Sequence, residues 1–421
     1  MSSKSIKIES PLSRILLGVS ALAIVAAVIY VFSWMFADSI SNSAQDKDVA
    51  EFAVGLAPQN PQAHYIVAML RENSFIPEDI PKSLAGFEKA ASLSPNDYRL
   101  WLALGKARES NGDVNGAELA LQRALELAPN YAQVQWLYGN ILLRQGKIKE
   151  AFAHIGKAVE GDPELANPAV NTAWSVFNGD LEKIKAVIGD SNYTRAALAS
   201  FFVKQKRFDE AMNIWNSIPA KEKKDTFKTE GENLFKSLIE EKKYRAALLV
   251  KNQLADNTRN TAIGRINNGS FEENIKDEQA EKFEWELGAG NQPQIAVDDQ
   301  QHHDGNRSLV LSFGGVNNRE FRNISQLVPI ESSKQYTLKL FYKSDLETTA
   351  KFVWEVVDTN DNKIIASTEA FAEKADWTSL NASFTTSENT EAVIIRVVRS
   401  DCDSALCPTS GRLWFDEFSL N

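Results

Sequence analysis

The hydrophobic and polar positions of this chain form three successive patterns. Residues 15–36 are one apolar run without a charged side chain, "ILLGVSALAIVAAVIYVFSWMF". As an α-helix rising about 1.5 Å per residue, such a run crosses the roughly 30 Å hydrocarbon core of a bilayer. Apolar residues then recur at helical spacing to about residue 257, and beyond residue 262 they alternate with polar ones as in β-strands. The patterns predict a multidomain chain with a transmembrane helix, an all-α region and an all-β sandwich.

The charges on either side of the apolar run differ in sign. They are Lys4, Lys7 and Arg14 before it, and Asp38, Asp46 and Asp48 after it. The positive-inside bias predicts that residues 1–14 are cytoplasmic, that residues 15–36 form a single-pass anchor in the inner (cytoplasmic) membrane, and that the rest is periplasmic. A cleaved signal peptide is the alternative, although the run is long and no clean A-x-A site follows it.

The helical region repeats itself every 34 residues. The recurring pairs are Gly105 and Gly139, Gly112 and Gly146, Ala117 and Ala151, Ala124 and Ala158, and Pro129 and Pro163. In this pattern Gly105 allows a close approach of two helices, Gly112 permits a tight turn, and Ala117 and Ala124 leave room where two helices cross. The segment "YRLWLALGKARESNGDVNGAELALQRALELAPN" resembles the tetratricopeptide repeat. We therefore predict a solenoid over residues 46–257, with three regular and two or three degenerate repeats.

The predicted solenoid is expected to have a concave groove. Seven residues on the first helices of two neighbouring repeats are expected to line it: Arg99, Leu102, Lys106, Gln133, Trp136, Asn140 and Arg144. Solenoids of this kind usually receive an extended peptide or a partner helix there. The sequence predicts an unidentified protein partner, and an ordinary solvated face is the alternative.

Seven or more alternating segments over residues 262–421 predict an antiparallel sandwich. Five segments resemble, in order, the jelly-roll carbohydrate-binding modules of xylanases and glucanases: "NGSFEE" as the opening strand, "DGNRSLVLSF", "ISQLVPIESSKQYTLKLFYKS", "DWTSLNASFTT" and "RLWFDEFSL". In such modules aromatic faces stack on sugar rings, which implies four candidates: Trp285, Tyr342, Trp354 and Trp377. Core packing is the favoured alternative for each of them alone. Candidates for flanking polar contacts are Arg319, Glu320, Arg322, Glu355 and Arg396.

The closing segment "GRLWFDEFSLN" places a carboxylate among bulky apolar residues. Strict alternation puts Asp416 on one face with Trp414, Phe418 and Leu420. Burying an unpaired charge costs several kcal/mol, so Asp416 needs a partner. The family resemblance implies a structural calcium ion that bridges the first and last strands through Glu272 and Asp416. The alternative is hydrogen bonding to backbone amides or to an arginine.

Two further clusters carry reactive side chains. Cys402 and Cys407, the only cysteines, lie five residues apart in a polar loop and predict a disulfide. Two free thiols or half of a metal site are the alternatives. The segment "DDQQHHDG" at residues 298–305 is rich in metal-binding residue types, but it falls between two predicted strands, and adjacent histidines rarely point to one centre. A solvated loop is therefore predicted there.

Composition and the absence of certain motifs argue against two classes of function, nucleic-acid binding and catalysis. The 421 residues carry a net charge of −10 without a dense basic patch, which argues against nucleic acid as a partner. The chain lacks a Gly-rich phosphate loop, G-x-S-x-G and H-E-x-x-H, so we predict that it is not an enzyme, with glycan hydrolysis by two carboxylates as the alternative. The prediction is a membrane-anchored envelope scaffold that binds a protein through the groove and polysaccharide through the sandwich, in assembly or export of a cell-surface polysaccharide. A pure protein–protein adaptor is the other hypothesis, and burial of Tyr342 and Trp354 would favour it.

Overall fold

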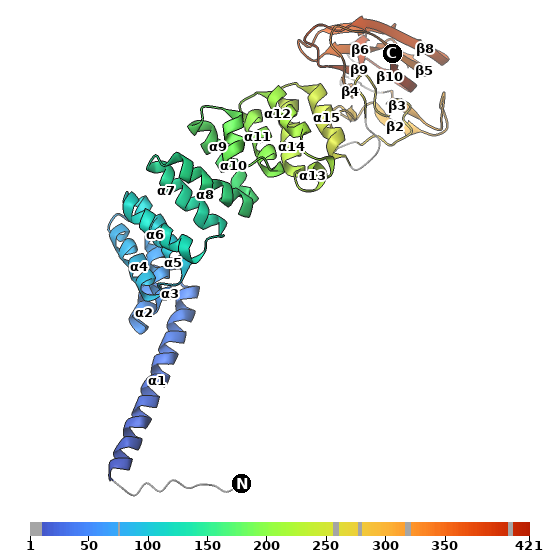
Figure 1. Ribbon diagram of the computed structural model, residues 1–421. Coiled ribbons are helices and arrows are strands. Elements are labelled where there is room, and N and C mark those ends of the chain that lie inside the picture. Colours follow the sequence, from blue (N-terminus) through green and yellow to red (C-terminus); the bar gives the residue numbers. More distant parts are fainter. Residues whose placement is uncertain (1–10, 75, 256–260, 277–279, 316–320, 403–406) are drawn as a thin grey trace, which may run out of the picture. The chain divides into compact units, whose positions relative to one another are not determined.

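The protein is described by a computed structural model that covers residues 11–421 except 75, 256–260, 277–279, 316–320 and 403–406 (Figure 1). The chain forms two compact units, residues 1–197 and 198–421. Their division falls within helix α11 (Asn192–Lys204), so it does not coincide with the predicted domain boundary near residues 257–262. Of the predicted cytoplasmic segment 1–14, residues 1–10 lie outside the described residues.

Helix α1 (Pro11–Ser43) contains the apolar run and extends beyond it at both ends. It is long and apolar enough to cross a membrane, and none of its most apolar stretch is buried in the protein. The remaining helices are α2 (Lys47–Leu56), α3 (Pro61–Glu72), α4 (Asp79–Leu93), α5 (Tyr98–Ser110), α6 (Val114–Leu127), α7 (Ala132–Arg144), α8 (Ile148–Gly161), the short 3₁₀ turn η1 (Pro163–Leu165), α9 (Ala166–Val176), α10 (Leu181–Ile188), α12 (Phe208–Asn216), α13 (Ala220–Asp225), α14 (Lys228–Glu240) and α15 (Tyr244–Leu254).

The three regular repeats are the helix pairs α3–α4, α5–α6 and α7–α8, as the 34-residue period predicts. A Cβ atom on Gly105 would lie only 2.6 Å from Cγ of Leu121, so this glycine permits the close contact of α5 with α6. Gly112 has a φ of +81° in the turn between these two helices. Ala117 and Ala124 are fully buried where helices cross. The small residues at repeated positions therefore have the structural roles expected from the sequence.

The C-terminal region is an antiparallel sandwich of two five-stranded sheets, which confirms the predicted fold class. One sheet has the order β1-β4-β9-β6-β7 and the other the order β2-β3-β10-β5-β8. The strands are β1 (Trp285–Leu287), β2 (Gln294–Asp298), β3 (Ser308–Gly314), β4 (Ile324–Pro329), β5 (Gln335–Thr348), β6 (Lys351–Asp358), β7 (Ile364–Ser367), β8 (Lys374–Thr385), β9 (Ala392–Asp401) and β10 (Thr409–Leu420). The core lies between the inner faces of the two sheets.

The prediction that "NGSFEE" forms the opening strand is wrong. Residues 268–273 form turns and irregular backbone, and β1 begins only at Trp285. The reason is conformational, because Asn268 and Phe271 have φ angles of 48° and 51°, which are incompatible with extended backbone. The segment still belongs to the sandwich, since Phe271 is fully buried and Gly269 O accepts a 2.9 Å hydrogen bond from Phe418 N.

The predicted strict alternation in β10 is also interrupted. The pairing of β10 with β5 shifts register between Asp416 and Ser419, and Glu417 has a φ of 53°. This β-bulge inserts an extra residue, so that Leu413, Phe415 and Phe418 all belong to the core. Phe418 and Asp416 therefore do not share a face.

The disulfide prediction is confirmed. Cys402 and Cys407 are joined with an S–S distance of 2.05 Å in the connection between β9 and β10. Residues 403–406 between them lie outside the described part of the chain.

Candidate functional site

Three of the four predicted sugar-binding aromatics are core residues. Trp285, Tyr342 and Trp354 are 3%, 5% and 0% exposed. The Trp285 indole donates to Asn268 O at 3.1 Å, and the Tyr342 hydroxyl accepts from Ala372 N at 3.2 Å. Their prediction as binding residues is wrong, because each lies on the face of its strand that the opposite sheet covers.

Trp377 lies instead at a different surface, the outer face of the sheet β2-β3-β10-β5-β8. Its ring makes an edge contact with His303 at 5.7 Å between centroids. His303 in turn stacks on Phe341 of β5, at 3.8 Å and an interplanar angle of 13°. We call His303, Phe341 and Trp377 the aromatic triad. Trp377 and Phe341 are half-buried and His303 is exposed, so the triad presents ring surface to solvent.

Charged and polar groups surround the aromatic triad. Lys339 lies 5.1 Å from the centre of the Phe341 ring, and Lys343 pairs with Asp376 at 3.2 Å. The backbone N–H of Trp377 and then the Lys343 ammonium lower the pKa of Asp376, which keeps it ionised. The strand positions opposite Phe341 and Lys339 on β8 are the exposed Ser379 and Asn381. Aromatic faces flanked by hydroxyl, amide and charged groups are suited to polyhydroxylated ligands.

The sequence contains a signal that distinguishes Phe341 from its neighbours on β5. In "QYTLKLFYKS", Leu340 and Tyr342 occupy the buried phase, and Phe341 is an apolar residue in the polar phase between Lys339 and Lys343. The position of His303 could not be read in this way. Its loop lies between β2 and β3 as predicted, but the side chain packs on Phe341 instead of being fully solvated.

Asp416 holds this loop against the sheet. Asp416 is fully buried and is paired across the strands with Phe341, so both face outward. Its Oδ2 accepts hydrogen bonds from His303 N at 2.8 Å and Asp304 N at 3.1 Å, and its Oδ1 accepts one from Glu417 N at 2.8 Å. Burial raises the pKa of Asp416 and these three N–H donors act against that rise. The carboxylate thus positions the backbone that carries His303.

Glu272, the second predicted calcium ligand, holds the same loop from the other end. Its Oε1 accepts hydrogen bonds from Asn306 N at 2.8 Å and Arg307 N at 3.2 Å, and these backbone donors lower the pKa of Glu272. Hydrogen bonding to amides, the alternative to calcium, therefore accounts for Glu272 and Asp416 alike. Within the described ranges, no group of three or more His, Cys, Asp or Glu side chains could hold a metal ion. Calcium stays a prediction.

The predicted polar contacts lie elsewhere. Arg396 and Glu355 form an ion pair at 2.8 Å between β9 and β6, in the sheet opposite the aromatic triad. Arg322 donates to Gly288 O at 3.0 Å, next to β1. Arg319 and Glu320 lie outside the described residues.

The seven groove residues lie on α5 and α7, the first helices of two adjacent repeats. Each keeps some exposed surface, and Arg99, Lys106 and Arg144 are the most exposed. Arg144 pairs with Glu109 at 3.1 Å, which links α7 to α5, and Arg99 pairs with Asp97 at 2.6 Å. Leu102 and Trp136 pack at the edge of one apolar cluster. The groove thus combines a half-buried tryptophan with basic side chains.

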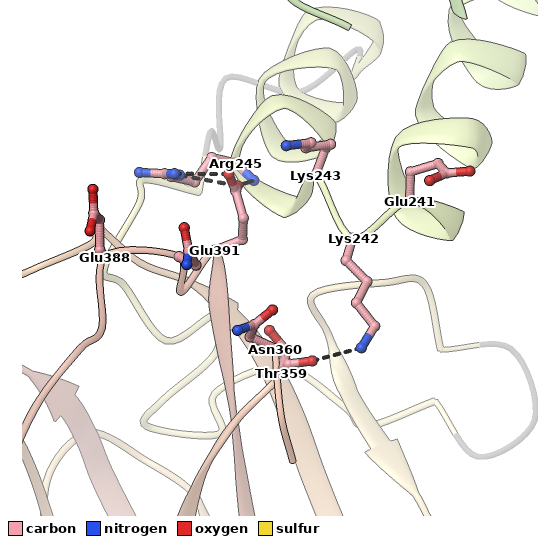
Figure 2. Close-up of a pocket in the computed structure, with 9 residues that line it drawn as sticks. Glu241, Lys242, Lys243, Arg245, Thr359, Asn360, Glu388 and Glu391 are labelled. Carbon is pink, nitrogen blue, oxygen red and sulfur yellow. Dashed lines mark hydrogen bonds and ion pairs between the residues drawn. The ribbon is translucent and has the colours of Figure 1, made fainter. Parts of the chain in front are cut away.

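Within the second unit, helix α15 is attached to the sandwich beside a polar cavity of about 350 Å³ (Figure 2). Arg245 contacts both carboxylate oxygens of Glu391, at 2.8 and 3.0 Å, and Lys242 donates to Thr359 O at 2.9 Å. Burial raises the pKa of Glu391, but the hydrogen bonds and charge of Arg245 outweigh it, so the net pKa is lowered. This contact is one of those that join α15 to the sandwich within the second unit.

Replacing Arg245 with Ala is expected to loosen this attachment and to lower the free energy of unfolding of the second unit by roughly 1–2 kcal/mol. Because the folded pKa of Glu391 is lowered, the pair stabilises the protein above the unfolded value of about 4.3, and its contribution is lost as the pH falls through the lower folded value. Hydrogen exchange in α15 between pH 3 and 7 measures this, with Asn360→Ala at the same cavity as the control. Equal pH profiles for the wild type and the Arg245 variant would contradict the expectation.

Comparison with known proteins agrees with this architecture. A family model for a carbohydrate binding domain matches residues 264–404, and one for the tetratricopeptide repeat matches residues 78–132 and 102–166. The chain combines tetratricopeptide repeats with a carbohydrate binding domain. Both predicted resemblances are thereby confirmed.

Individual relatives cover only parts of the chain. The BBSome complex member bbs-4 of Caenorhabditis elegans is 37% identical over 81 residues, which are 19% of this chain and 17% of that protein. This match therefore spans less than a fifth of that relative's length. A solved structure titled "CBM4 structure and function" is 18% identical and covers 37% of this chain and 98% of its own, with a TM-score of 0.28. The crystal structure of MamA is 18% identical and covers 38% of this chain and 89% of its own, with a TM-score of 0.32.

Proposed function

We propose that this protein is a non-catalytic scaffold of the cell envelope, anchored in the inner membrane by α1 with the bulk of the chain in the periplasm. Its sandwich binds polysaccharide and its repeat groove recruits a protein partner, in assembly or export of a cell-surface polysaccharide. The two family matches support the two binding roles, and both kinds of domain are binding modules rather than catalysts. The length and apolar composition of α1 support the anchor.

The observation that carries the sugar-binding role is the aromatic triad with its polar surroundings. The solvent-accessible ring surface of Trp377 can stack on a pyranose ring beside the stacked pair of His303 and Phe341, while Ser379, Asn381 and Asp376 lie nearby on β8. The loop that carries His303 is held by buried hydrogen bonds to Asp416, so the triad is formed before a ligand arrives. Preorganisation of this kind reduces the entropy lost on binding.

Replacing Trp377 with Ala is expected to weaken binding of a recognised polysaccharide by about tenfold or more, because one stacking face is lost. The measurement is affinity electrophoresis and calorimetry of the full-length protein in detergent against a panel of soluble polysaccharides. Phe341→Ala should also weaken binding of the polysaccharide.

The matched control is Ile364→Ala, because Ile364 is an apolar side chain that is 54% exposed and lies on β7 of the opposite sheet. This variant should bind like the wild type, and all variants should melt within a few degrees of it. Wild-type binding by the Trp377 variant to a polysaccharide that the protein recognises would rule out the triad as the site.

The groove supports the second part of the proposal. Trp136 supplies apolar contact area, and Lys106 and Arg144 supply positive charge beside it. A groove of this composition suits an extended segment that carries an apolar anchor and acidic residues.

The burial of Trp285, Tyr342 and Trp354 favours a second candidate function, a protein–protein adaptor in which the sandwich is a spacer or docking module. These residues were predicted to stack on sugar rings, and of the four predicted aromatic residues only Trp377 is not buried. If the folded wild-type protein bound none of the polysaccharides in the panel, the adaptor function would be the better supported of the two.

A further inference from the structure

Helix α1 does not end where the apolar run ends. Its last two turns, residues 37–43, continue into the folded first unit. Ala37 and Ser41 are 0% and 1% exposed, and Ala37 belongs to one buried cluster with Ala53 and Ala57 of the α2 region. The end of the apolar helix is therefore part of the helical packing of the repeat region. Ala63 of α3 belongs to the same cluster, so, if α1 spans a bilayer as the proposed function requires, the first repeat packs against the end of the membrane-spanning helix.

The hairpin of α1 and α2 brings part of α2 to the level of the predicted membrane boundary. Helix α1 ends at Ser43, and α2 begins at Lys47 and runs back along it (Figure 1). Ala37 lies six residues before the end of α1, and Ala53 lies six residues after the start of α2, so the two are level and share the same cluster. By the same count Leu56 is level with Trp34, which lies within the apolar run. The last turn of α2 is thus level with the aromatic end of that run.

Part of one apolar face of α2 is uncovered in the described chain. Ala50 and Ala53 are buried, and Ala53 belongs to the cluster that contains Ala37 of α1. Val49, Phe52 and Leu56 follow the i, i+3, i+7 spacing of one helix face, which we call the α2 stripe, and Leu56 at its end is half-buried against that cluster. Phe52 is 58% exposed and Val49 is 46% exposed. By the same count Phe52 is level with Asp38, two residues beyond the apolar run, where the boundary between headgroups and acyl chains would be.

We propose that the α2 stripe inserts into the outer boundary layer of the bilayer and fixes the orientation of the first repeat on the membrane surface. This inference rests on the proposed membrane anchor. The occupant is lipid because, by residue count along the hairpin, the stripe begins at the level of the aromatic end of the apolar run and exposes Phe52 and Val49 just beyond it. On α2 the charges of Lys47 and Glu51 are paired with Asp79 and Arg71, at 3.0 and 2.7 Å, and the exposed Asp48 adds a negative charge, so the chemistry favours zwitterionic over anionic lipid.

The test places a single fluorescent probe at chosen sites of the full-length protein. Cys402 and Cys407 are bonded to each other, so a thiol-reactive bimane labels only an introduced cysteine. The variants are Phe52→Cys in the stripe, Val28→Cys within the apolar run and Leu119→Cys on α6, whose native side chain is 66% exposed. Each labelled protein is reconstituted into phosphatidylcholine nanodiscs with lipid that carries a doxyl quencher either near the headgroup or deep in the acyl chain.

The expected result is quenching at residue 52 by the shallow quencher, about twofold or more above that at residue 119, and quenching at residue 28 by the deep quencher. Quenching at 28 with none at 52 would overturn the stripe proposal and leave the anchor standing. No quenching at 28 would instead overturn the anchor on which the inference rests. Disulfide cross-linking between Phe52→Cys copies without quenching at 52 would assign the stripe to a second copy of the chain and overturn the lipid proposal.

Discussion

Replacing Trp354 with Ala is expected to lower the free energy of unfolding of the sandwich by about 3–5 kcal/mol, because it leaves a large cavity in the core. Trp354 is fully buried, and its ring lies 4.7 Å from Phe418, 5.3 Å from Phe415 and 6.0 Å from Trp285 between centroids. These aromatic contacts join the two sheets. Chemical denaturation followed by near-ultraviolet circular dichroism measures the loss.

Trp354→Phe is the matched control. The indole Nε1 of Trp354 is buried and has no hydrogen-bond partner among the described residues, so phenylalanine removes volume without removing a hydrogen bond. This variant should lose clearly less stability than the alanine variant. If Trp354→Ala melted like the wild type but lost polysaccharide binding, Trp354 would be a binding residue, as the sequence predicted.

The second large effect is expected for Asp416→Ala. This change removes the acceptor for three backbone N–H groups, those of His303, Asp304 and Glu417. Buried donors without a partner cost about 1–3 kcal/mol each, so we expect a loss of roughly 3–5 kcal/mol after partial hydration of the opened loop. Hydrogen exchange of the three amides should accelerate, and the position of His303 above Phe341 should be lost.

Asp304→Ala is the control for Asp416, because it removes an exposed carboxylate from the same loop and keeps the backbone N–H that Asp416 binds. It should leave both stability and amide exchange close to wild type. If Asp416→Ala exchanged its loop amides at the wild-type rate, the carboxylate would not be what holds the loop. Calcium-dependent stability of the wild type alone would then point back to the predicted ion.

The repeat region shows how far a local pattern can be used for prediction. The 34-residue period was enough to locate the three regular helix pairs, and it correctly assigned roles to Gly105, Gly112, Ala117 and Ala124. Each repeat contacts mainly its neighbours, so the same residue types recur wherever the same contact recurs. The sandwich was predictable for a related reason, since alternation over many segments requires sheets with one buried face.

The sugar-binding residues depended on information that alternation does not contain. A period of two divides a strand into two faces, but which face is covered depends on the opposite sheet. Tyr342 and Phe341 are neighbours on β5, and only the packing of the sandwich places Tyr342 inside and Phe341 outside. His303 joins Phe341 because Asp416, 113 residues away in the sequence, binds its backbone.

The sequence by itself determined the order of the parts: an apolar helix, a helical repeat array and an antiparallel sandwich with a disulfide before its last strand. Those features arise from interactions between residues close in sequence or from patterns repeated many times, so they can be read along the chain. Only the tertiary structure decided the bulge at Glu417, which separates Phe418 from Asp416, and the aromatic triad on the outer face. These depend on single contacts between distant segments, and the free energy of such a contact leaves no periodic trace in the sequence.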